Sequence, residues 1–551
     1  MRILKKVPRP HGLNEPILHR DNHGRPSSRR DFISAGLMTG PAVVAATGLL
    51  GMIASSRRAL ALAPDMLDLK QNVPGACNIQ AGAGKIPFIC FDLAGGANLN
   101  GSEILIGNRG GQLDFLSTAG YGKLGLPGNM VPNAPNAASA TNNFIDTQFG
   151  AAWHSDGAIL RGMIERTAAG TRALTNGAAI AARSENDTGN NPHNPMYGIM
   201  KAGSRGELLT LIGSQATDSG GNSMAPASMI DPTARPTKVD RASDVTGLVD
   251  TGDPTVLPRG VSVDVLESMV RLSGGTTVGG VGGNGKLGKL DMGVRDGAIQ
   301  NALRCAYLKS AYLADTFGDP SALNPDKDAD IVDPTATRAN GIFGLTEYQG
   351  DGEFRKTAAV MKMVVNGYAG AGTITMGGYD YHTGNRSDGE GRNLRAGRCI
   401  GACLEYAARK GKPLMIYIFS DGSLNATNMI DNSTGGRGKF GWQGDNQSVA
   451  ASIILVFSPT GRPQVLTPDP AGVAGGLGKQ IGYYRADGSI ETASHPGANA
   501  VNLLVETVIL NYMALHGEQG NFSTLFPSNG LGSSTLRDSI TAFAPIVTGP
   551  I

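Results

Sequence analysis

Short apolar runs that alternate with segments of helical periodicity constrain the fold of this chain most. Residues 85–93 (KIPFICFDL), 413–419 (PLMIYIF) and 450–457 (AASIILVF) are mostly apolar at consecutive positions, which is typical of strands buried on both faces. Residues 174–182 and 372–376 are two further predicted strands. Helical spacing of apolar residues predicts helices over 152–172, 261–272, 295–317, 353–368, 392–410 and 499–515. The alternation predicts a doubly wound α/β domain, with a mainly parallel sheet and helices on both faces.

The N-terminus has the order of a signal peptide: a basic region, a charge-free run over 32–56 and then small residues. Arg29 and Arg30 before the apolar run are typical of the twin-arginine type. We therefore expect export through the twin-arginine translocation machinery to the periplasm or the cell exterior. Cleavage after Ala61 is favoured over cleavage after Ala63, because Pro64 would follow the second cut. The alternative is an uncleaved anchor, since a run this long could span a bilayer; after cleavage we expect no stable transmembrane segment.

Composition narrows the class of partner. Ten of the 48 basic and three of the 46 acidic residues precede residue 62, which leaves 38 basic and 43 acidic residues in the mature chain. A mildly acidic chain without a clustered basic face is not expected to bind nucleic acid. The five cysteines are an odd number, so at least one thiol is unpaired within the chain.

We predict three parts along the chain: a signal peptide over 1–61, a lead-in over 62–84 and a single α/β domain over 85–551. Insertions are expected near 214–258, 273–291 and 318–338, where polar residues or glycines dominate. In the last of these, Asp326, Asp328 and Asp330 have the spacing of a calcium loop. Ile331 and Thr337 stand where that loop needs Gly and a bidentate Glu, so a solvated loop is the better interpretation.

Unusual residues follow the ends of three predicted strands. Residues 94–102 (AGGANLNGS) follow the predicted strand 85–93. Residues 377–382 (GGYDYH) follow the predicted strand 372–376, and residues 420–423 (SDGS) follow the predicted strand 413–419. A glycine-rich segment, 438–446 (GKFGWQGDN), comes next. Ligands of doubly wound sheets bind at the carboxyl ends of the strands, so these segments are predicted to meet around a site.

These segments, in this order and with the export signal, resemble a widespread, largely uncharacterised family of twin-arginine-exported proteins related to the alkaline phosphatase and sulfatase superfamily. Its members show a Gly-Gly-Trp-Asp-Thr-His motif, and the resemblance runs loosely from about residue 85 to 515. It implies an alkaline-phosphatase-like α/β fold and a metal-dependent hydrolase of phosphate or sulfate esters. Carried over by position, the metal ligands would be Asp380, His382, Asp421 and Asp445, and Ser102 would be the nucleophile. Further candidate pocket residues are Asn98, His193 and Trp442.

The chain departs from the family pattern where two histidines are expected. Phe440 and Asn446 occupy those positions, and Phe440 cannot bind a metal. The resemblance therefore implies a reduced, oxygen-rich site for one divalent metal ion whose identity is open.

Each candidate also has a structural interpretation. Asp380 and His382 could bond each other across a loop, Asp421 could form a turn, and Ser102 could cap a helix. Trp442 could belong to the core.

Three functions remain open: a degenerate hydrolase of anionic esters, a non-catalytic binding or assembly module of the cell envelope with a protein partner, and a redox or cofactor protein. The third ranks last, because the chain has no CxxC, haem or dinucleotide motif.

Overall fold

The computed structural model describes residues 62–72, 84–134, 143–184, 191–249, 259–273, 295–317, 319–335, 338, 340–382 and 386–549. The predicted signal peptide with Arg29 and Arg30, and most of the predicted insertion over 273–291, lie outside these residues. Within the described ranges, none of the helices combines the length and apolar character that a membrane span requires.

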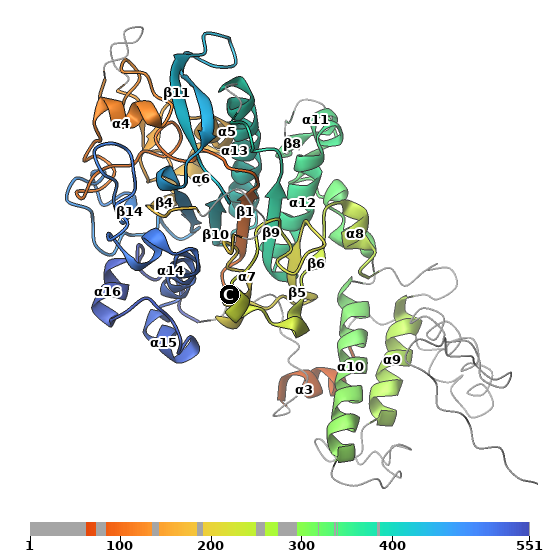
Figure 1. Ribbon diagram of the computed structural model, residues 1–551. Helices are drawn as coiled ribbons and strands as arrows, with labels where there is room; N and C mark the ends of the chain where they lie inside the picture. Colours follow the sequence, from red (N-terminus) through yellow and green to blue (C-terminus); the bar gives the residue numbers. More distant parts are fainter. Residues whose placement is uncertain are drawn as a thin grey trace, which may run out of the picture.

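An eight-stranded sheet forms the centre of the molecule (Figure 1). Its order is β14 (Lys479–Ile481), β4 (Thr175–Ile180), β13 (Ser452–Phe457), β10 (Leu414–Phe419), β1 (Phe88–Leu93), β9 (Ala369–Met376), β5 (Leu209–Gly213) and β6 (Thr237–Lys238). β13 pairs antiparallel with both of its neighbours, and the other strand pairs are parallel. The prediction of an α/β domain with a mainly parallel sheet is confirmed, and the sheet is mixed because of β13.

Alternate residues of the central strands belong to two separate hydrophobic clusters. In β10, the first cluster takes Leu414, Ile416 and Ile418, and the second takes Met415, Tyr417 and Phe419. The first cluster includes residues of α5 (Ala158–Arg166), α12 (Gly352–Val365) and α13 (Arg386–Arg409). The second includes residues of α7 (Met196–Lys201) and α14 (Val501–Ala514). Because each face of the sheet packs against its own cluster, the side chains of the central strands are apolar on both faces. The uninterrupted apolar runs of the sequence predict this arrangement.

A third, smaller cluster joins the start of the described chain to a helix pair. Residues of α3 (Pro64–Asn72), α9 (Arg259–Ser273) and α10 (Arg295–Phe317) form it, and these helices lie together beside the sheet domain (Figure 1). Cys305 of α10 is disulfide-bonded, whereas the described cysteines Cys90, Cys399 and Cys403 are free and buried.

The remaining described elements are shorter and connect or cover the sheet. The helices are α4 (Thr118–Lys123), α6 (Ala169–Ala173), α8 (Ala242–Thr246), α11 (Leu345–Gly350), α15 (Phe522–Leu525) and α16 (Ser534–Ser539). The paired strands are β2 (Ile145–Asp146) with β3 (Trp153–His154), β7 (Val332–Asp333) with β8 (Phe343–Gly344), and β11 (Leu424–Ile430) with β12 (Phe440–Asp445).

The three aspartates over residues 326–330 have side-chain partners within the protein. Asp328 forms an ion pair with Lys362, Asp330 forms one with Lys410, and Asp326 accepts a hydrogen bond from Tyr348. These three carboxylates therefore bind neighbouring side chains, and Asp328, whose side chain is 10% exposed, is not solvated as the sequence predicted.

Candidate metal site

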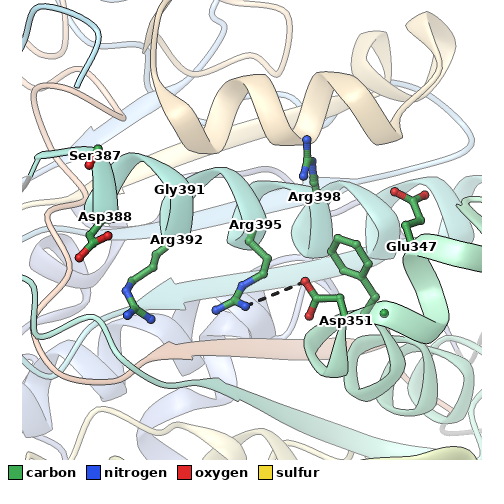
Figure 2. A pocket seen from close by; sticks show the side chains of 10 residues that line it. Glu347, Asp351, Ser387, Asp388, Gly391, Arg392, Arg395 and Arg398 are labelled. Atoms are coloured by element: carbon green, nitrogen blue, oxygen red, sulfur yellow. Dashed lines mark ion pairs between the residues drawn. The ribbon is translucent and has the colours of Figure 1, made fainter. Parts of the chain in front are cut away.

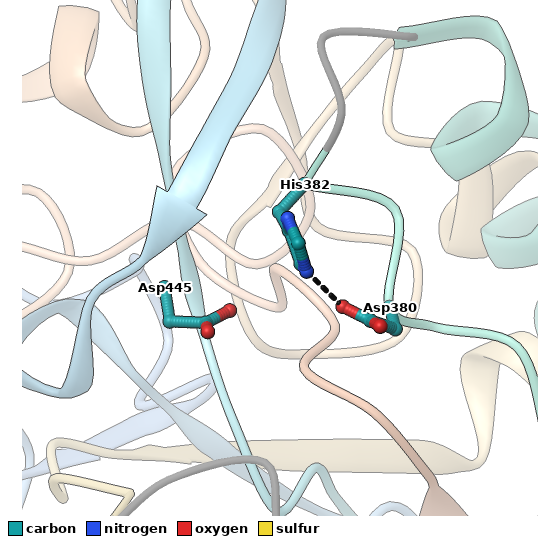
Figure 3. Close-up of side chains that lie close together, drawn as sticks. All are labelled: Asp380, His382 and Asp445. Atoms are coloured by element: carbon teal, nitrogen blue, oxygen red, sulfur yellow. Dashed lines mark ion pairs between the residues drawn. The ribbon is translucent and has the colours of Figure 1, made fainter.

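Three side chains meet where β9 and β12 end. Asp380 and His382 belong to the loop after β9, and Asp445 is the last residue of β12 (Figure 3). One ligand atom from each residue lies within 4.8 Å of the other two. His382 Nε2 is 2.5 Å from Asp380 Oδ1, and both side chains are partly exposed. Two carboxylates and an imidazole in reach of solvent are a donor set that suits a divalent metal ion.

Asp421, the fourth predicted ligand, does not join this group. Its side chain is fully buried, and Oδ1 accepts a hydrogen bond of 2.7 Å from the backbone N–H of Gly95. Oδ2 accepts one of 3.2 Å from the Asn222 amide. Burial, and next the nearby Asp92 carboxylate, raise the pKa of Asp421 to about 7. Asp421 thus links the loop after β10 to the loop after β1 through a buried hydrogen bond.

Asp92 is the residue that the sequence analysis missed. It lies in β1, fully buried, and burial raises the pKa of its carboxyl. Its oxygens accept hydrogen bonds from the backbone N–H groups of Asn222 and Ser223, at 2.7 and 2.9 Å, and from the Thr375 hydroxyl at 3.1 Å. One acidic residue inside an otherwise apolar strand was the signal, because a buried carboxyl needs such partners. Asp92 fixes part of the predicted insertion over 214–258 onto the end of the sheet.

Ser102 lies in a buried network. Its side chain has no exposed surface, and its hydroxyl donates a hydrogen bond to Asn98 Oδ1 at 3.2 Å. Asn98, also fully buried, donates from its amide to Asn100. The turn that carries Ser102 belongs to no helix, so neither a helix cap nor an accessible nucleophile matches this position.

The two remaining pocket candidates are buried aromatic side chains. Trp442 is 1% exposed, and the guanidinium of Arg386 lies 4.3 Å from the centre of its ring. His193 is 2% exposed and stacks on Phe419 with the ring centres 5.4 Å apart. Among the described residues, neither ring nitrogen of His193 has a hydrogen-bond partner, and burial lowers the pKa of His193 to about 3. Neither side chain lies in the group of Asp380, His382 and Asp445.

Gly95 allows the loops after β1 and β9 to approach each other. Its φ is +120°, a conformation that only glycine adopts readily, and a Cβ there would lie 2.7 Å from the backbone nitrogen of Asp380. The Gly95 backbone therefore sets the position of Asp380 as well as that of Asp421.

Replacing Gly95 by Ala should lower the free energy of unfolding by about 2–3 kcal/mol, because the new methyl group meets backbone and the φ is strained. Thermal unfolding of the purified protein measures this. Gly377→Ala is the matched control in the neighbouring loop after β9, since a Cβ at that position has no atom within 4 Å. Equal losses in the two variants would contradict the proposed close approach.

Comparisons of the chain with protein-family models, with curated proteins and with solved structures found no match. The interpretation of the site therefore depends on its own geometry.

Proposed function

We propose that this chain is an exported, extracytoplasmic protein of alkaline-phosphatase-like fold, doubly wound with helices on both faces of the sheet. We further propose that Asp380, His382 and Asp445 hold one divalent metal ion in a degenerate hydrolase of anionic esters. The observation that carries this proposal is the convergence of these three donors at the end of β9, where doubly wound sheets bind their ligands.

The chemistry follows from the donor set. Three protein ligands leave coordination positions for water and for an oxygen of the ester, as in other catalytic metal sites. A divalent metal ion there would supply charge for the developing oxyanion and lower the pKa of a bound water. The Asp380 and His382 side chains would orient each other through their 2.5 Å contact. Because Ser102 is buried, water is the favoured nucleophile rather than that hydroxyl.

Export is supported by two independent features. Arg29 and Arg30 precede the apolar run of the predicted signal, which implies the twin-arginine machinery as a partner. Cys305 is disulfide-bonded, and disulfides persist mainly in oxidising compartments such as the periplasm.

Elemental analysis of the mature protein, purified without chelators, tests the metal site. We expect about one equivalent of a divalent metal in the wild type and at least a tenfold loss in the double variant Asp380→Ala, His382→Ala, because two of three ligands are removed. Asp388→Ala is the control: this exposed carboxylate lies close in sequence but outside the group. A metal-free wild-type protein would refute the proposal.

The alternative is a non-catalytic binding or assembly module of the cell envelope. Phe440 and Asn446 favour it, because neither supplies an imidazole. The Asn446 side chain instead accepts hydrogen bonds from the backbone N–H and the hydroxyl of Ser448 at the start of a short 3₁₀ helix. Metal-loaded protein that leaves a set of phosphate and sulfate esters intact would support this alternative; hydrolysis that disappears with Asp380→Ala would exclude it.

A further inference from the structure

A cavity of about 590 Å³ opens between α11, α12 and α13 (Figure 2). Its lining consists mainly of charged side chains and glycines: Glu347, Gly350, Asp351, Phe354, Ser387, Asp388, Gly391, Arg392, Arg395 and Arg398. None of the sequence-based site candidates lies in this lining.

Two of the arginines face the cavity with little to bind. Figure 2 shows Arg392 and Arg395 leaving α13 on the same side, as expected for residues three positions apart. Among the described residues, the hydrogen-bond acceptor of the Arg392 guanidinium is the Gly377 carbonyl, 3.5 Å from Nη1. Arg395 Nη1 lies 3.9 Å from Asp351 Oδ2, and its buried Nε has no hydrogen-bond partner among the described residues. Most of the N–H groups of these two guanidiniums are therefore available to a ligand.

The other charged lining residues are largely engaged elsewhere. Arg398 leaves α13 on the opposite side in Figure 2 and pairs with Glu165 at 2.6 Å. Both oxygens of Glu347 accept hydrogen bonds from Arg166. Asp351 caps α12 by accepting from the backbone N–H of Glu353 at 2.8 Å. Asp388 is exposed at the start of α13.

The cavity adjoins the loop of the candidate metal site. Arg392 reaches the Gly377 carbonyl and packs against Gly378, where a Cβ would collide with its guanidinium. Gly378 has a φ of +82° and stands two residues before Asp380. The same short loop therefore contacts Arg392 at its beginning and carries the candidate metal ligands at its end.

We propose that this cavity binds an oxyanion, a phosphate or sulfate group, with Arg392 and Arg395 as its anchors. Planar guanidinium groups bind such groups through paired N–H donors. Because the loop 377–382 joins the cavity to the metal ligands, the ligand is an ester with two anionic groups, one for each end of the loop. This second statement rests on the proposed function; oxyanion binding itself does not.

Calorimetric titration of the metal-free mature protein with inorganic phosphate, and in parallel with sulfate, tests the cavity by itself. We expect saturable binding, weakened at least fivefold by Arg392→Gln and by Arg395→Gln. Arg409→Gln is the matched control, with the same charge loss on the same helix but outside the cavity lining, and should stay within twofold of the wild type. Asp351→Asn should tighten binding about threefold, because it removes the one carboxylate that faces Arg395 and retains a capping side chain. Unchanged thermal unfolding verifies that each variant is folded.

The outcomes separate this inference from the proposed function. Absent binding in the wild type, or equal weakening by Arg409→Gln, overturns the oxyanion site even if the metal is found. If the wild-type protein binds phosphate but is found to hold no metal when purified, the oxyanion site is supported. The statement that the ligand is an ester with two anionic groups is then overturned.

Discussion

Replacing Glu390 by Gln should lower the free energy of unfolding by about 3–5 kcal/mol, because it removes the shared partner of buried cations. Glu390 on α13 is 4% exposed, and its Oε1 accepts hydrogen bonds of 2.8 Å from both Arg386 and Lys439. Arg161 of α5 binds its other oxygen at 2.8 Å. Burial alone would raise the pKa of Glu390, but Lys439 and Arg386 hold it down to about 2.

The size of the effect comes from the cations that remain. Lys439 has no exposed surface and Arg386 is 1% exposed, so neither can turn to water when the carboxylate is lost. Among the described residues, Lys439 then keeps Asp156 as its partner, whose backbone oxygen lies 2.8 Å from Nζ. Lys439 directly precedes β12, which carries Asp445, so this cluster also holds one ligand of the candidate site in place.

Chemical denaturation at pH 7.5 measures the loss. The control is Asp487→Asn, which breaks the ion pair of Asp487 with Lys123, whose side chains are 57% and 48% exposed. Exposed pairs contribute less than about 1 kcal/mol, so this variant should unfold almost as the wild type does. A Glu390→Gln variant as stable as this control would show that the buried cluster does not hold the helices together.

Replacing His193 by Phe should make the protein more resistant to acid. The free energy of unfolding of the variant minus that of the wild type should be about 3 kcal/mol larger at pH 4.5 than at pH 7.5. His193 is the suitable residue because its ring already stacks on Phe419, and neither ring nitrogen has a hydrogen bond to lose within the part of the chain that the structure describes.

The sign follows from proton binding. Burial lowers the pKa of His193 from 6.5 to about 3, so between these values the unfolded chain binds a proton that the folded chain does not. The contribution of neutral, buried His193 to the free energy of unfolding is therefore fully present above pH 6.5, and it is lost as the pH falls below that value. Phenylalanine has no proton to bind, which removes this contribution.

Thermal unfolding of both proteins at the two pH values checks the expectation. His495→Phe is the contrasting variant, because His495 Nε2 lies 2.8 Å from the Ala181 carbonyl and the substitution loses that bond at either pH. A His193→Phe effect that is the same at pH 4.5 and 7.5 would mean that His193 is not held neutral in the fold.

Local pattern predicted most of the α/β core. The consecutive apolar residues of β1, β10 and β13 and the periodicity of α10, α12, α13 and α14 were recognised because each reports burial of its own segment. The short strands β5, β6 and β14 were missed, since the five, two and three residues of these strands carry little apolar pattern. The direction of β13 was also not predictable, because a fully buried strand looks the same in either direction.

The sequence by itself determined the alternation of strands and helices and the position of Asp380 and His382 directly after a strand, because these depend on residues close in the chain. Tertiary structure alone decided that Asp445 joins them, that Asp421 is buried against Gly95, and that Arg392 and Arg395 face a cavity. Those arrangements depend on contacts between distant segments, whose geometry is fixed only when β1, β9, β10 and β12 are packed together.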